Sequence, residues 1–150
     1  MEGSDLIALA ALGISALSAI YSYRTVQQAK RANELALHAQ KVAIYEEVVS
    51  FSDCFRGLFA VPTSERLEQF KKNAVQRGEL YLSEAAYSRL NEIYNHCSDS
   101  EIWLSIANSE GQGSGDKPTD LEVRQEYKSV LDLLYPVIDL VKQEAKIDHT

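Results

Sequence analysis

The chain opens with an apolar segment, Leu6 to Tyr23, which contains 18 residues and no charged side chain. At 1.5 Å per residue, a helix of this length spans about 27 Å, close to the roughly 30 Å hydrocarbon core of a bilayer. Tyr21, Tyr23 and Arg24 stand where aromatic and basic side chains gather at a membrane interface. The pattern predicts that residues 1–23 form a short tail and a transmembrane helix.

Two other interpretations of this segment are possible. A cleaved signal peptide begins with a basic region, whereas this chain begins with Met-Glu-Gly-Ser-Asp, which is acidic. An alanine-rich helix buried in the core of a soluble protein is the stronger alternative, because small residues are common in such helices. We expect the membrane-spanning helix.

The charges on either side of the segment predict its orientation. Glu2 and Asp5 precede it, and the bases that follow are Arg24, Lys30, Arg31 and Lys41. The positive-inside rule places the N-terminus outside and the rest of the chain in the cytoplasm, anchored in the inner (cytoplasmic) membrane. The chain has only two cysteines, which agrees with a cytoplasmic domain, since secreted domains of this size more often carry a disulfide framework.

Small residues recur every three or four positions along this segment and continue beyond it. We call this set the small-residue stripe: Ala8, Ala11, Ser15, Ser18, Ser22, Thr25, Ala29, Ala32, Ala36, Ala39 and Ala43. Such faces let membrane helices approach closely, and a sustained repeat of 3.5 residues favours a left-handed coiled coil. We expect homo-oligomerisation through Ala8, Ala11, Ser15, Ser18, Ser22, Ala29, Ala32 and Ala36. The alternative is that the stripe packs on the protein's own bundle.

The rest of the chain has helical patterns and no strand-like alternation, which predicts an all-α fold. Residues 24–43 form a juxtamembrane stalk, and residues 44–150 form a small antiparallel helical bundle that packs with the long helix and carries a flexible glycine-rich loop at 108–119. Apolar positions from Ile44 to Leu58 extend the stalk helix, which should end before Pro62 and bend near Gly57.

Three further helices follow in the predicted bundle. One begins at Thr63 or Ser64 and is interrupted near Gly78; the next begins at Ser83 and breaks around residues 98–100. The last begins at residues 118–120, and Pro136 should kink or break it. The expected core positions are Leu67, Phe70, Ala74, Val75, Leu80 to Leu82, Ala86, Leu90, Ile93, Cys97, Leu104, Ala107, Leu121, Tyr127, Val130, Leu131, Leu134, Ile138 and Val141.

The net charge and the candidate catalytic and metal-binding residues argue against several classes of function. Without Glu2 and Asp5, 20 acids face 15 bases, and this acidic balance argues against nucleic acid. Glu92 and His96 share a helical face, but a zinc site needs three or four ligands. The acid pairs Glu46–Glu47 and Glu122–Glu126 are expected on solvated faces. We predict no catalytic residue, no metal and no cofactor, and hence no enzyme.

Three stretches resemble a group of uncharacterised bacterial membrane proteins with one span. The stretches are Ala29-Lys30-Arg31-Ala32-Asn33-Glu34-Leu35-Ala36, Ile44-Tyr45-Glu46-Glu47-Val48-Val49-Ser50-Phe51, and Tyr81-Leu82-Ser83-Glu84 followed by Leu90-Asn91-Glu92-Ile93. The resemblance covers the first two-thirds of the chain. It implies a bacterial origin and an all-α fold, and it brings no catalytic residues.

These observations favour a membrane-anchored interaction or scaffold module that contacts the lipid bilayer, self-associates and binds a cytoplasmic protein. The alternative is an oligomeric effector, toxin-like or linked to defence, that perturbs the bilayer through the serines of the stripe. An enzyme with a site assembled from scattered residues is a third class.

Overall fold

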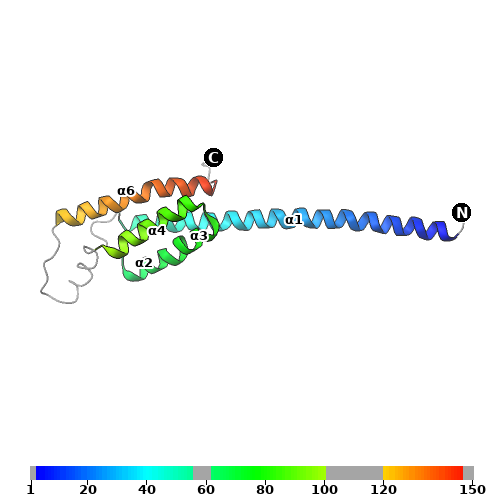
Figure 1. The fold of residues 1–150 in the computed structure, drawn as a ribbon, viewed down its shortest axis with the longest axis horizontal. Helices are drawn as coiled ribbons and strands as arrows, with labels where there is room; N and C mark the ends of the chain where they lie inside the picture. The colour runs from blue at the N-terminus through cyan, green and yellow to red at the C-terminus, as the bar shows by residue number, and fades with distance from the viewer. Residues whose placement is uncertain (1–2, 56–61, 101–119, 147–150) are drawn as a thin grey trace. The chain divides into compact units, whose positions relative to one another are not determined.

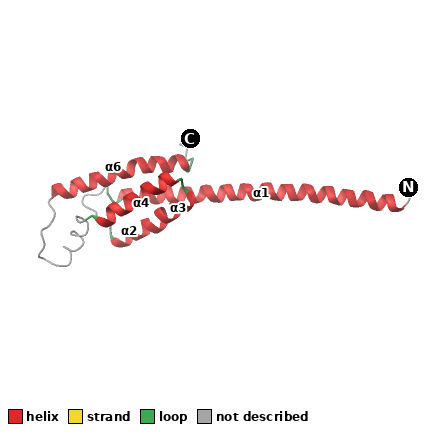
Figure 2. Ribbon diagram, in the orientation of Figure 1, coloured by secondary structure: helices red, strands yellow, loops and turns green. Residues whose placement is uncertain are grey.

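The protein is all-α, as predicted. In the computed structural model, which describes residues 3–55, 62–100 and 120–146, every regular element is a helix (Figure 1, Figure 2). The chain divides into two compact units, Met1–Leu37 and His38–Thr150. The predicted loop at 108–119 and the core positions Leu104 and Ala107 lie outside the described residues.

Helix α1 runs without a break from Gly3 to Asp53. Its residues Ile44, Val48 and Phe51 are buried in the core of the second unit. The helix ends before Pro62, but the predicted extension to Leu58 is wrong, because the backbone turns after Asp53: Cys54 N–H donates to the Phe51 carbonyl and Phe55 N–H to that of Ser52. These three-residue bonds tighten the last turn. Gly57 lies outside the described part of the chain.

The second helical segment consists of α2 (Ser64–Phe70), the π-helix η1 (Lys71–Val75) and α3 (Gln76–Tyr81). The predicted start is confirmed, since the Thr63 hydroxyl accepts from Arg66 N–H at 3.2 Å. Gly78 does not interrupt the helix. A Cβ at this position would stand 3.0 Å from Leu90 Cδ1, so the missing side chain is what allows α3 to lie close to α4.

The wider π turn explains how this segment buries neighbouring residues. Gln76 N–H donates to the Lys71 carbonyl, a five-residue step, and Phe70, Ala74 and Val75 are all buried. In an α-helix, Phe70 and Val75 would be about 140° apart, whereas the wider turn of a π-helix brings residues five apart much closer to the same side. Both side chains can therefore face the core.

Helix α4 (Glu84–Asp99) begins and ends close to the predicted positions. The Ser83 hydroxyl caps it by accepting from Ala86 N–H at 3.3 Å. Its buried face consists of Ala86, Leu90, Ile93 and Cys97, as the spacing predicts.

Helix α6 (Asp120–Glu144) contains Pro136 and continues past it, so the predicted break is wrong. Proline removes one hydrogen bond, to the carbonyl of Asp132, and both residues are exposed, so water can solvate that carbonyl. The buried residues recur at spacings of four and three: Val123, Tyr127, Val130, Leu134, Val137 and Val141.

Two predicted core positions are wrong. Leu80 is 74% exposed and Leu121 is 65% exposed. Each stands two residues from a buried position, Gly78 and Val123 respectively, and two residues correspond to about 200° around a helix. Both side chains therefore point away from the core.

Within the second unit, neighbouring helices run antiparallel, which agrees with the predicted bundle. Lys41 and Ser83 both contact Glu144 near the end of α6, whereas Phe55 meets Tyr127 near the start of α6, with ring centroids 5.8 Å apart. The core is centred on Phe51, which stacks on Phe70 at 4.0 Å and meets the edge of Phe55 at 5.3 Å.

Candidate membrane-contacting helix

The N-terminal part of α1 exposes large apolar side chains beside and opposite the small-residue stripe. Between 52% and 73% of the surface of Ile7, Leu9, Leu12, Ile14, Leu17 and Ile20 is exposed. The helix is long and apolar enough to cross a membrane, and none of its most apolar 18-residue window is buried. A helix from a soluble core would be mostly covered, so the described residues do not support that alternative.

The predicted interface residues lie at the end of this apolar part. Tyr21 and Tyr23 are 68% and 67% exposed, and Arg24 is exposed as well. Because the two tyrosines are two residues apart, they point to nearly opposite sides of α1. Their amphipathic rings are therefore available at the same depth on both sides of the helix, as an aromatic belt requires.

The eight residues predicted for oligomerisation all lie on α1, and all are exposed. Two hydroxyls along the stripe are already satisfied within the helix: Ser15 Oγ donates to the Ala11 carbonyl, and Thr25 Oγ1 to that of Tyr21, both at 2.9 Å. A donor satisfied in this way needs no partner in hydrocarbon, which lowers the cost of placing Ser15 there.

The stripe extends over five heptads, from Ala8 to Ala43. On a straight α-helix, a seven-residue repeat drifts by about 20° per heptad, so the two ends differ by about 100°. Ala39 is exposed and Ala43 is half-buried in the second unit. Continuous contact between two such stripes therefore needs a left-handed supercoil.

The second unit places His96 beside a different acid from the one that the sequence indicates. His96 Nε2 lies 3.3 Å from Glu126 Oε1 on α6, and Glu92 pairs with Arg89 instead. A shallow polar depression lies beside the His96–Glu126 pair. Among the described residues, no three His, Cys, Asp or Glu side chains are grouped to hold a metal ion.

The two acid pairs differ from the expected solvated faces. Glu46 is exposed, but Glu47 pairs with Arg66 and its side chain is only 13% exposed. The Glu126 side chain is 16% exposed. One acid of each pair therefore joins two helices, a role that only the tertiary partner reveals.

Cys97 is buried, as predicted. Desolvation, with a smaller effect from Glu126, raises the pKa of its thiol to about 12. A thiol that stays protonated is a poor nucleophile and a poor metal ligand, so Cys97 serves as a small core residue.

Comparison of the chain with models of protein families, with curated proteins and with solved structures finds no match.

Proposed function

We propose that this chain is a bacterial single-pass membrane protein whose helical bundle serves as a non-catalytic interaction or scaffold module. The N-terminal part of α1 anchors it in the inner membrane, with the N-terminus outside and the bundle in the cytoplasm. The bundle binds a cytoplasmic protein partner, and copies of the chain associate through the small-residue stripe.

The observation that carries this proposal is the exposed apolar surface of α1. Its six exposed leucines and isoleucines between residues 7 and 20 are worth about −2 to −4 kcal/mol together on the membrane-insertion scale. The same side chains would be unfavourable in water, because they form a contiguous apolar surface that a soluble monomer rarely exposes. A bilayer covers such a helix on all sides.

The anchor is tested by expressing the full chain in bacteria and extracting membranes with alkaline carbonate. We expect it to stay in the membrane fraction, and a chain that starts at Lys30 to be released. Release of both would refute the span. Protease added to spheroplasts should leave the bundle intact if it is cytoplasmic, and degradation of the bundle would reverse the proposed orientation.

Self-association is tested by changing Ala8 and Ala11 to leucine, because bulk on the stripe prevents close approach of two helices. The matched control changes Ala10 and Ala16 to leucine, which adds the same apolar volume on other faces of α1. Crosslinking in mild detergent should yield an oligomer for the natural chain and the control, and a monomer for the stripe variant. An equal response of the two variants would refute association through the stripe.

A second candidate function is an oligomeric effector, toxin-like or linked to defence, that perturbs the bilayer. The observation that favours it is a row of exposed serines, Ser15, Ser18 and Ser22, on one face of the apolar helix. Such a face is able to line a water-filled path between several copies. Induced expression with a potential-sensitive dye distinguishes the two functions, since a passive anchor leaves the membrane potential unchanged.

A further inference from the structure

A second stripe of α1 runs from the apolar part of the helix into its basic part. It comprises Ile14, Leu17, Tyr21, Arg24, Gln28 and Arg31, which follow one another at spacings of three, four, three, four and three residues. We call it the arginine face. Because α1 is unbroken over these residues, all six lie within an arc of about 100°.

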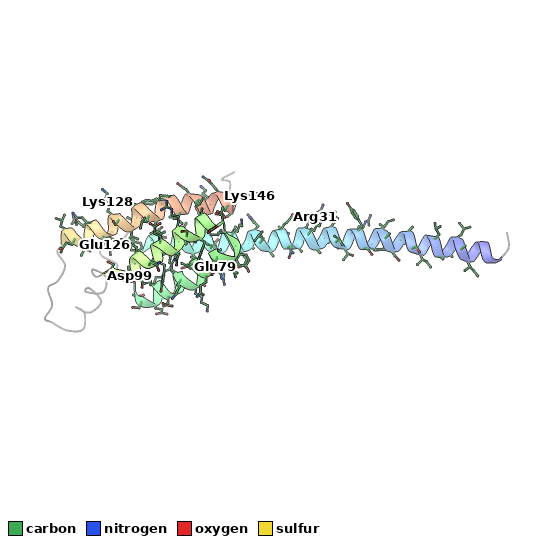
Figure 3. The ribbon with its side chains drawn as sticks, in the orientation of Figure 1. Arg31, Glu79, Asp99, Glu126, Lys128 and Lys146 are labelled. Carbon is green, nitrogen blue, oxygen red and sulfur yellow. The ribbon has the colours of Figure 1, made fainter. Side chains whose placement is uncertain are left out.

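The side chains of the arginine face are exposed. Ile14, Leu17 and Tyr21 are 66%, 57% and 68% exposed, and Gln28 and both arginines are exposed as well. No carboxylate of the described residues lies within ion-pair distance of Arg24 or Arg31. Figure 3 shows Arg31 among the free side chains along α1. Both guanidinium groups are therefore available to an anion.

We propose that the arginine face binds the headgroup of an anionic phospholipid. This inference rests on the proposed membrane span. Ile14 and Leu17 lie along the acyl chains, Tyr21 lies at the level of the ester groups, and Arg24 and Arg31 hold the anionic headgroup. The order of apolar, amphipathic and cationic side chains along one face of the helix matches the order of those groups along a lipid molecule.

The direction of the side chains supports the participation of Arg31. The two arginine positions are seven residues apart, about 10 Å along the helix. This distance slightly exceeds the Debye length of about 8 Å at physiological salt, so the backbone position of Arg31 alone would leave its charge partly screened from the membrane surface. Side chains of an α-helix tilt toward its N-terminus, which here is the direction of the membrane. A long Arg31 side chain therefore extends back toward the surface, where a planar guanidinium can bind phosphate with two hydrogen bonds.

The two arginines of this face lie off the small-residue stripe. Arg24 and Arg31 each lie about 200° around the helix from one member of the stripe, Ser22 and Ala29 respectively, and about 100° from the next member, so neither lies on it. A second copy packed on the stripe would keep both guanidinium groups on the outside of the pair. Lipid binding and self-association are therefore compatible on one helix.

The test uses the full chain, delipidated in mild detergent, and native mass spectrometry with phosphatidylglycerol or phosphatidylcholine of identical acyl chains. We expect the natural chain to prefer phosphatidylglycerol. Arg24→Gln should lower the ratio of the two apparent affinities about fivefold and Arg31→Gln about twofold, because the charge at position 31 is further from the surface. The control is Arg124→Gln, which removes an exposed charge from α6 and should leave the ratio unchanged.

Several results would overturn the inference. One is equal binding of the two lipids by the natural chain. The others are an unchanged affinity ratio in the variant that lacks both arginines, and an equal fall of that ratio in the Arg124→Gln control. Each of these results would leave the arginines a role in orientation alone. Displacement of the lipid by an equal concentration of inorganic phosphate would show that a free anion is the ligand. Failure to retain either lipid would count against the membrane span itself.

Discussion

The Glu47–Arg66 pair allows a quantitative test of how the bundle is held together. Arg66 on α2 bonds to the Glu47 carboxylate on α1, donates through its second nitrogen to Ser50 Oγ at 3.2 Å, and lies 5.5 Å above the Phe51 ring. The two charged side chains are only 17% and 13% exposed. We therefore expect the pair to be much less screened by water than a surface pair.

The magnitude follows from this burial. Hydrogen bonds to charged groups contribute roughly 1.5–3 kcal/mol, whereas exposed ion pairs contribute about 0.2–1 kcal/mol. For a pair that keeps some contact with solvent, we expect a coupling energy of about 1–2 kcal/mol. The chain contains a matched control in Arg89–Glu92, an i,i+3 pair at 3.0 Å whose side chains are 62% and 49% exposed. That pair should couple by only about 0.3 kcal/mol.

The assay is a double-mutant cycle at each site, with Glu47→Gln and Arg66→Gln at one and Arg89→Gln and Glu92→Gln at the other. The free energy of unfolding would be measured by urea titration of the full chain in mild detergent, followed by circular dichroism at 222 nm. Equal coupling energies at the two sites would refute the argument that burial strengthens the Glu47–Arg66 pair.

Three further predictions concern single residues. In the folded chain, the pKa of the Cys97 thiol is raised from 9.0 to about 12, so the unfolded chain loses this proton first as the pH rises. The free energy of unfolding should therefore fall by about 1.4 kcal/mol per pH unit between these two values. Urea titrations at several pH values measure this pH dependence, and Cys97→Ala should remove it. Pro136→Ala restores a helical hydrogen bond and should raise the free energy of unfolding by at least about 1 kcal/mol; an unchanged urea midpoint would contradict this. Leu80→Gln should change stability by less than about 0.5 kcal/mol, whereas Leu90→Ala in the core should cost about 2–5 kcal/mol; thermal melts compare the two.

Features set by local chemistry were predictable from the sequence. The starts at Thr63 and Ser83 depend on a hydroxyl that caps the N–H three residues further on, and both bonds form. The core face of α4 follows from a simple helical repeat. The apolar segment of α1 was equally clear, because no charge interrupts it.

Features set by tertiary contacts were not predictable. α1 ends at Asp53 because the chain turns to place Phe55 against Tyr127, a residue far along the sequence. The π turn reflects the need to bury Phe70 and Val75 together, and no local helix propensity indicates such a turn. Val123 and Val137 were discoverable, since they complete the four-three repeat of α6, but the nearby Leu121 and Pro136 obscured it.

The candidate membrane-contacting helix was predictable in position but not in detail. Leu6 to Tyr23 and the stripe follow directly from the order of residues. The hydrogen bond from the Ser15 hydroxyl to the Ala11 carbonyl depends on the rotamer of the serine side chain. The partner of His96 depends on how α4 and α6 are aligned. These details decide which polar groups remain free to bind something else.

The π turn at Lys71–Val75 has a consequence for the tolerance of this protein to length changes. Its hydrogen bond joins residues five positions apart, one position more than the bond of an α-helical turn. Loss of a single exposed residue there, such as Lys72, would convert the turn to an α-helical one and would leave the buried positions of α2 and α3 on the same side. Elsewhere in the bundle, a one-residue deletion rotates every later core position of the helix by about 100°. In homologues, single-residue insertions and deletions within helices should therefore concentrate in this turn.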